Sequence, residues 1–127
     1  MAERNFDFLE TIGRKKRVLA GSFAPDTANP PTAIRGSGYS VVRTAQGVFT
    51  LTFANSYAEL TAAVASVQLA TGAAREAQIG TYTPATSSAA ATLVIRVLDN
   101  AAAAQDIAAD ANNRVHFVLV FNDALTV

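Results

Sequence analysis

One stretch near the C-terminal end decides the fold of this chain: Arg114-Val115-His116-Phe117-Val118-Leu119-Val120-Phe121. Val115, Phe117, Leu119 and Phe121 occupy alternate positions, which is the period-two pattern of a β-strand. The positions between them include Val118 and Val120, so both faces of the strand are largely apolar. A strand of this kind is typical of the middle of a sheet that is covered on both sides.

The same alternation occurs in two earlier segments. Phe49, Leu51 and Phe53 alternate with threonines, and Leu93, Ile95 and Val97 alternate with Thr92, Val94 and Arg96. These patterns predict half-buried strands whose apolar side chains pack against the inner face of the C-terminal strand. Further strands are expected at 18–23, 39–43 and 78–83, and a glycine-containing hairpin turn at 45–47.

Three segments between these strands need separate interpretation. Residues 24–33 hold three of the four prolines and are predicted to be a loop. Residues 56–71 fit either a helix, with Ser56 and Glu59 as a capping box, or a strand after a turn at 56–59; we favour the strand. Residues 99–113 contain four consecutive alanines, which favours a short helix across one end of the sheet.

Short strands separated by turn signals predict a mainly β fold, a β-sandwich or barrel that is jelly-roll-like. We expect residues 18–127 to form this β domain and residues 1–17 to form an extended N-terminal arm. The arm contains five basic and three acidic residues, including both lysines of the protein. The first residues lack the basic-then-apolar order of a signal peptide, so we expect the protein to be made and kept inside a cell or a particle assembled there.

The composition argues against catalytic and metal-binding sites. The chain has no cysteine and one histidine, His116, which cannot form a zinc site without further nitrogen or sulfur ligands. We expect His116 to be a packed or interface side chain. No Gly-x-Ser-x-Gly motif is present, so we expect no enzyme activity, no metal and no cofactor. The net charge is zero, so no long-range electrostatic field attracts membranes or nucleic acid. We therefore expect neither of them as a partner.

Two further polar groups have simple structural explanations. The sequence Arg35-Gly36-Ser37-Gly38 lacks the lysine and the following helix of a phosphate loop, and it is predicted to be a bend between strands. Asp99, Asp106 and Asp110 do not have the spacing of an EF-hand loop. We expect these aspartates to cap turns or face solvent, with an adventitious cation site as a minor alternative.

Several stretches resemble small virion proteins of tailed bacteriophages. They are Gly21-Ser22-Phe23-Ala24-Pro25, Arg35-Gly36-Ser37-Gly38-Tyr39-Ser40-Val41, Gly47-Val48-Phe49-Thr50, Asp106-Ile107-Ala108-Ala109 and Asn112-Asn113-Arg114-Val115-His116-Phe117. The resemblance implies a capsid decoration (cement) protein on the virion exterior, made in the host bacterial cytoplasm. It further implies that the protein binds the major capsid protein and forms a homo-oligomer, with a trimer favoured. The alternative is a receptor- or carbohydrate-binding module of a tail or head fibre.

The N-terminal arm is the expected partner-binding segment. Its apolar side chains are too few to form a core, and a basic run follows them. We hypothesise that these side chains fill pockets on the capsid while the basic run faces acidic groups; the residues are Phe6, Phe8, Leu9, Ile12, Arg14, Lys15, Lys16 and Arg17.

A truncation tests the arm directly. A variant lacking residues 1–13 should keep its melting temperature but lose most of its binding to capsids, because the apolar anchors are removed and the exposed charge contacts of the remaining basic run contribute little by themselves. Cosedimentation with capsids and a thermal melt measure the two properties. If the shortened protein binds as tightly as the full chain, the capsid contact lies on the β domain.

Overall fold

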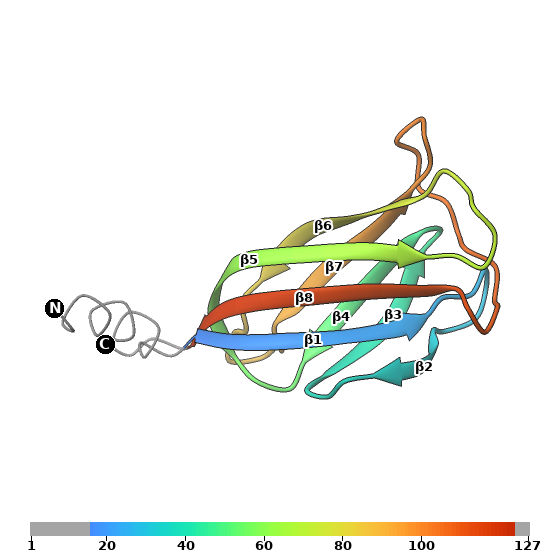
Figure 1. The fold of residues 1–127 in the computed structure, drawn as a ribbon. Coiled ribbons are helices and arrows are strands. Elements are labelled where there is room, and N and C mark those ends of the chain that lie inside the picture. The colour runs from blue at the N-terminus through green and yellow to red at the C-terminus, as the bar shows by residue number, and fades with distance from the viewer. Residues whose placement is uncertain (1–15, 124–127) are drawn as a thin grey trace, which may run out of the picture.

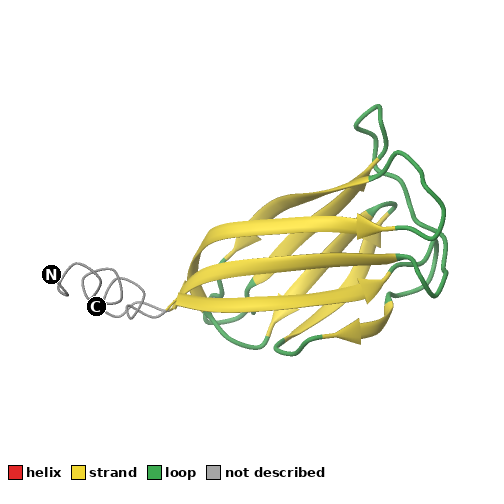
Figure 2. Ribbon diagram, in the orientation of Figure 1, coloured by secondary structure: helices red, strands yellow, loops and turns green. Residues whose placement is uncertain are grey.

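Residues 16–123 of the computed structural model form a β-sandwich of two antiparallel four-stranded sheets (Figures 1 and 2). One sheet has the strand order β2-β1-β8-β5 and the other the order β3-β4-β7-β6. The strands are β1 Lys16–Ala24, β2 Thr32–Arg35, β3 Tyr39–Ala45, β4 Val48–Phe53, β5 Tyr57–Gln68, β6 Glu76–Thr83, β7 Thr92–Leu98 and β8 Arg114–Asp123. The β-sandwich prediction is confirmed, and no helix occurs in these residues.

Three of the six strand pairings in residues 16–123 join consecutive strands. β1–β2, β3–β4 and β6–β7 are consecutive neighbours, whereas β8 returns from the far end of the chain and lies between β1 and β5. Figure 1 shows β5, β8 and β1 side by side in front of the second sheet. The central position predicted for the C-terminal strand is therefore correct.

The core fills the space between the sheets. The inner face of β8 contributes Val115, Phe117, Leu119 and Phe121, all of which are buried as predicted. The alternating side chains of β4 and β7 belong to the same buried cluster, which confirms the predicted packing partners: Phe49, Leu51, Phe53, Leu93, Ile95 and Val97. The period-two pattern thus identified the two inward faces correctly.

The last two residues of the predicted 24–33 loop belong to a short strand. β2 occupies 32–35, and it pairs with β1 through Ser22 opposite Arg35 and Ala24 opposite Thr32. The spacing leaves one extra residue on β2, and Ala33 in this irregularity has a positive φ of 48°. All four β2 side chains are exposed, so the segment has no apolar alternation that could have revealed it.

The ambiguous segment 56–71 is a strand, as favoured, but the turn predicted at 56–59 is wrong. β5 begins at Tyr57, whose buried ring stacks on Phe121 with ring centroids 4.3 Å apart and an interplanar angle of 11°. The hydroxyl of Tyr82 on the other sheet donates to the carbonyl oxygen of Tyr57 at 2.8 Å. These contacts hold the start of the strand against the core.

The helix predicted in 99–113 does not form. The carboxylate of Asp99 accepts hydrogen bonds from the backbone N–H groups of Ala101 at 2.8 Å and Ala103 at 3.0 Å, and Ala102 adopts a positive φ of 61°. A side chain that binds the backbone in this way competes with helix formation. The chain then runs back along β7, and Ile107 is buried in the core.

Candidate functional site

The outer face of the β2-β1-β8-β5 sheet carries contiguous apolar side chains, which we call the valine surface. Two adjacent rows cross β1, β8 and β5: Val18, Val120 and Ala62 form one row, and Ala20, Val118 and Val64 form the next. Val18, Val64 and Val118 are 68%, 67% and 46% exposed. Single exposed apolar side chains are ordinary, whereas contiguous groups of them are less common on the surface of a monomer.

The valine surface corrects one prediction about β8. The strand was expected to be covered on both faces, but the second sheet covers only the face that carries Phe117 and Leu119. Val118, on the opposite face, remains accessible to solvent. One apolar face of β8 packs in the core. The other apolar face belongs to a surface that no other part of residues 16–122 covers.

A polar row borders the valine surface where the strands meet the chain ends. Lys16 lies opposite Asn122 in the β1–β8 register, and Glu59 lies opposite Asn122 on the other side. The ammonium group of Lys16 donates to the side-chain oxygen of Asn122, whose amide nitrogen donates to the Glu59 carboxylate. β1 begins at Lys16, so Lys16 and Arg17 belong to the sheet and not to the arm predicted for residues 1–17.

The opposite border is basic, and we call it the basic end: Arg35, Arg114 and His116. Ser22 lies between Arg35 on β2 and His116 on β8 in the strand register. The Nε2 atom of the half-buried His116 pairs with the side-chain oxygen of Gln68 at 2.7 Å.

Arg114 is the most unusual member of the basic end because it is only 4% exposed. Its Nε and Nη2 atoms donate to the Ser22 hydroxyl at 3.1 and 2.9 Å, and Nη2 also donates to the carbonyl oxygen of Ala33 at 2.5 Å. Burial, and then the nearby charge of Arg35, lower the pKa of the Arg114 guanidinium. Arginine is seldom buried unless it is paired.

The glycine-rich bend beside the basic end is confirmed. Gly36 and Gly38 have positive φ values of 94° and 88°. The bend places Tyr39 so that its hydroxyl lies 2.6 Å from the carbonyl oxygen of Arg35 and 3.1 Å from that of Ser22. A side chain at Gly21 would collide with this hydroxyl, which accounts for a glycine there. Burial raises the pKa of Tyr39.

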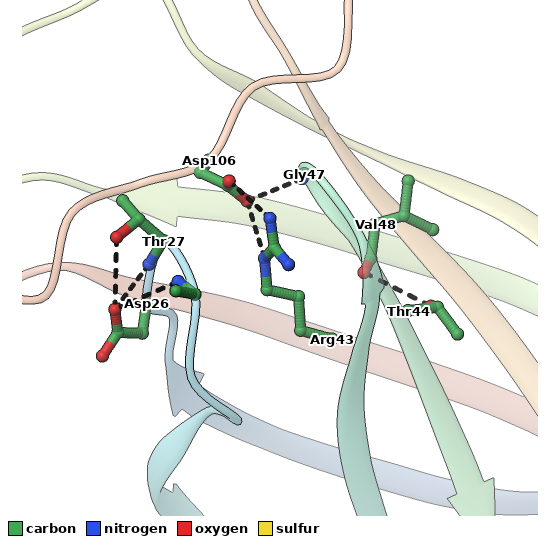
Figure 3. A network of polar contacts seen from close by, with 8 residues as sticks. Asp26, Thr27, Arg43, Thr44, Gly47, Val48 and Asp106 are labelled. Atoms are coloured by element: carbon green, nitrogen blue, oxygen red, sulfur yellow. Dashed lines mark hydrogen bonds and ion pairs between the residues drawn. The ribbon is translucent and has the colours of Figure 1, made fainter.

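A salt bridge fastens the long β7–β8 connection to the β3–β4 turn (Figure 3). The guanidinium of Arg43 donates to both carboxylate oxygens of Asp106, at 3.1 and 2.7 Å, and the backbone N–H of Gly47 donates to the same carboxylate at 2.8 Å. The Arg43 hydrogen bonds hold the pKa of Asp106 below its usual value. The expectation of a solvated or capping Asp106 is therefore wrong.

The other two aspartates of that connection do cap turns, as predicted. Asp99 accepts the backbone hydrogen bonds described above, and Asp110 accepts one from the N–H of Asn112 at 2.8 Å. Within residues 16–122, no three histidine, cysteine or acidic side chains are grouped so that they could hold a metal ion.

A hollow of about 610 Å³ lies at the end of the sandwich where β1 begins. β1, the 36–38 bend and the loop before β5 line it, and Arg17 and Tyr57 are its titratable side chains. Among the described residues, the lining includes no histidine, cysteine or carboxylate side chain. At the basic end, His116 bonds Gln68 and no serine, so a Ser–His pair is not assembled there.

Six of the eight predicted partner-binding residues lie outside the described part of the chain: Phe6, Phe8, Leu9, Ile12, Arg14 and Lys15. The other two, Lys16 and Arg17, lie on β1 next to the valine surface. The valine surface was not predicted, although the apolar second face of β8 was the signal that pointed to it.

Comparison with protein-family models finds no match for this chain, and searches of curated proteins and of solved structures also return none. In the described residues there is no helix of the length and hydrophobicity required to cross a membrane.

Proposed function

We propose that this protein is a non-enzymatic virion structural protein that decorates and stabilises the capsid by binding the major capsid protein. The valine surface is the single observation that carries the proposal, because its contiguous exposed side chains on a rigid sheet are typical of a protein-docking face. The sequence stretches that resemble phage decoration proteins supply the identity of the partner. In this proposal the protein sits on the capsid exterior as a homo-oligomer, with a trimer favoured.

A fibre-associated receptor- or carbohydrate-binding module is less well supported. Sugar-binding sites commonly present exposed aromatic rings, which combine apolar area with a polar edge. Every aromatic side chain in residues 16–122 is buried or half-buried, and most belong to the core between the sheets. The decoration function therefore remains the main proposal.

Two isosteric substitutions test the docking role of the valine surface. The double variant Val18→Thr and Val64→Thr keeps the side-chain shape and β-branching but adds two hydroxyl groups that docking would bury. We expect its affinity for capsids that lack the protein to fall about tenfold or more, since tenfold corresponds to about 1.4 kcal/mol. Cosedimentation over a range of protein concentrations measures the affinity.

Val42→Thr is the matched control. Val42 is 50% exposed but lies on β3, in the other sheet. The control variant should bind capsids like the unmodified protein. Equal binding by the double variant would place the contact elsewhere, and a full-length protein that does not bind capsids at all would overturn the decoration function. A cryo-EM map of decorated capsids would also show whether the copies contact one another as trimers.

A further inference from the structure

We propose that the basic end of the valine surface contains a carboxylate-binding site, formed by Arg114, Ser22 and Arg35. The site receives an aspartate or glutamate side chain of the protein that docks on the valine surface. The identity of that partner rests on the proposed function, whereas the anion chemistry rests on the three residues themselves.

Arg114 and Ser22 have hydrogen-bond donors without an acceptor among the described residues. A guanidinium has five N–H donors. The contacts of Arg114 use Nε and Nη2, and its Nη1 atom has no acceptor among the described residues. The Ser22 hydroxyl accepts both arginine bonds, and its own hydrogen has no acceptor there either. The pair therefore offers up to three adjacent donors to a ligand.

The positive charge of Arg114 is not compensated by a carboxylate of the described residues. The acceptors of Arg114 are a hydroxyl and a carbonyl oxygen, both neutral, and no carboxylate within residues 16–122 forms a salt bridge with it. Arg35 lies opposite Ser22 and carries a second positive charge. This charge raises the free-energy cost of keeping the Arg114 guanidinium charged. A nearly buried cation beside another cation is stabilised by an anion that binds both.

The site is held in place before any ligand binds. The Ala33 carbonyl that orients Arg114 belongs to the irregularity between β1 and β2, where Ala33 has an unfavourable positive φ. The Tyr39 hydroxyl holds the backbone of Arg35 and Ser22 together on the other side. Backbone strain that the surroundings maintain is common at binding sites, where it fixes the geometry of the contact groups.

The surroundings favour a protein carboxylate over nucleic acid. The site adjoins the valine surface, so a partner that covers the valines brings its own side chains to Arg35 and Arg114. Surfaces that bind single-stranded nucleic acid combine an extended basic groove with exposed aromatic rings. Here the described aromatic side chains are buried or half-buried, and the basic end is a compact group at one end of an apolar face.

An anion titration of the full-length protein tests the site. The isotope-labelled protein is titrated with sodium acetate, and separately with inorganic phosphate, at constant ionic strength. The Nε–Hε signal of Arg114 and the backbone amide signals of Ser22 and Ala33 report binding by NMR. We expect saturable shifts with acetate, and we expect Arg35→Gln to weaken the apparent affinity at least about fivefold, because one of two positive charges is removed.

Arg35→Gln is preferred to an Arg114 variant because Arg35 is exposed, whereas loss of the buried guanidinium could disturb the β1–β2 pairing. Arg96→Gln is the matched control, since Arg96 lies on β7 in the other sheet and should leave the titration unchanged. The proposal is overturned if acetate produces no saturable shift, or if Arg35→Gln and Arg96→Gln have equal effects. Saturation by phosphate alone would assign the site to a phosphate-bearing partner and reject the carboxylate.

The titration and the capsid assay can fail independently. Acetate binding is measured on the isolated protein, so it does not depend on whether capsids are the partner. In the capsid assay, Arg35→Gln should reduce both the affinity and its dependence on salt concentration, because a charge contact is lost while the valines remain. Unchanged affinity and salt dependence in this variant would show that the partner does not use the site.

Discussion

Phe117→Ala is expected to destabilise the protein by about 3–5 kcal/mol, the typical cost of removing a phenylalanine from a packed core. Phe117 is 2% exposed, and its ring meets Tyr39 edge-on with centroids 5.0 Å apart. The substitution removes this contact and leaves a cavity between the sheets. Urea denaturation followed by circular dichroism measures the change in the free energy of unfolding.

The neighbouring residue is the control for this prediction. Val118→Ala changes the same strand, but on the outer face, where the side chain is partly exposed. Its cost should stay below about 1 kcal/mol, since little packing is lost. Similar losses in the two variants would contradict the assignment of Phe117 to the core and of Val118 to the surface.

Gly47→Ala is expected to destabilise the protein by about 2–5 kcal/mol. Gly47 has a positive φ of 67°, a conformation that costs other residues roughly 1–2 kcal/mol. An added Cβ would also lie 2.6 Å from the backbone nitrogen of Gln105 and 2.9 Å from the carbonyl oxygen of Val97. Relief of such an overlap by a backbone shift typically costs a further 1–3 kcal/mol or so.

The shift would also disturb the salt bridge in Figure 3, because the Gly47 N–H donates to Asp106. Gly72→Ala is the control: no atom lies within 4 Å of its added Cβ. We expect this variant to be neutral or stabilised by less than about 1 kcal/mol, through a less flexible unfolded chain. The same denaturation experiment applies. A Gly47 variant as stable as the Gly72 variant would show that the turn and the β7–β8 connection are not in close contact.

The sequence was informative wherever apolar side chains alternate. The pattern around Phe117 correctly identified the inner face of β8, and the patterns around Leu51 and Ile95 identified its packing partners. β2 was missed because its four side chains are all exposed, so pairing with β1 alone defines it. The helix predicted in 99–113 was wrong because the Asp99 carboxylate binds the backbone locally, which alanine propensity does not reveal.

The candidate sites depend on strand register, which residue type alone does not determine. Val18 and Val64 become part of one surface because both strands pair with β8, and these pairings join residues far apart in the chain. In the same way, Ser22, Arg35 and Arg114 meet only after β1 has paired with both β2 and β8. Arg114 is buried although arginine is generally exposed, so its burial could not be predicted from residue type.

The β1–β8 pairing also determines how the molecule responds to mechanical tension. Lys16, at the start of β1, lies opposite Asn122, near the end of β8, and the strands run antiparallel from there. A force that pulls the start of β1 away from the end of β8 therefore separates the two strands from this end. The hydrogen bonds between them break one pair at a time. A shearing force along the strands would instead act on all of the β1–β8 hydrogen bonds at once. A load applied across the outer face of the sheet would not act in the peeling direction.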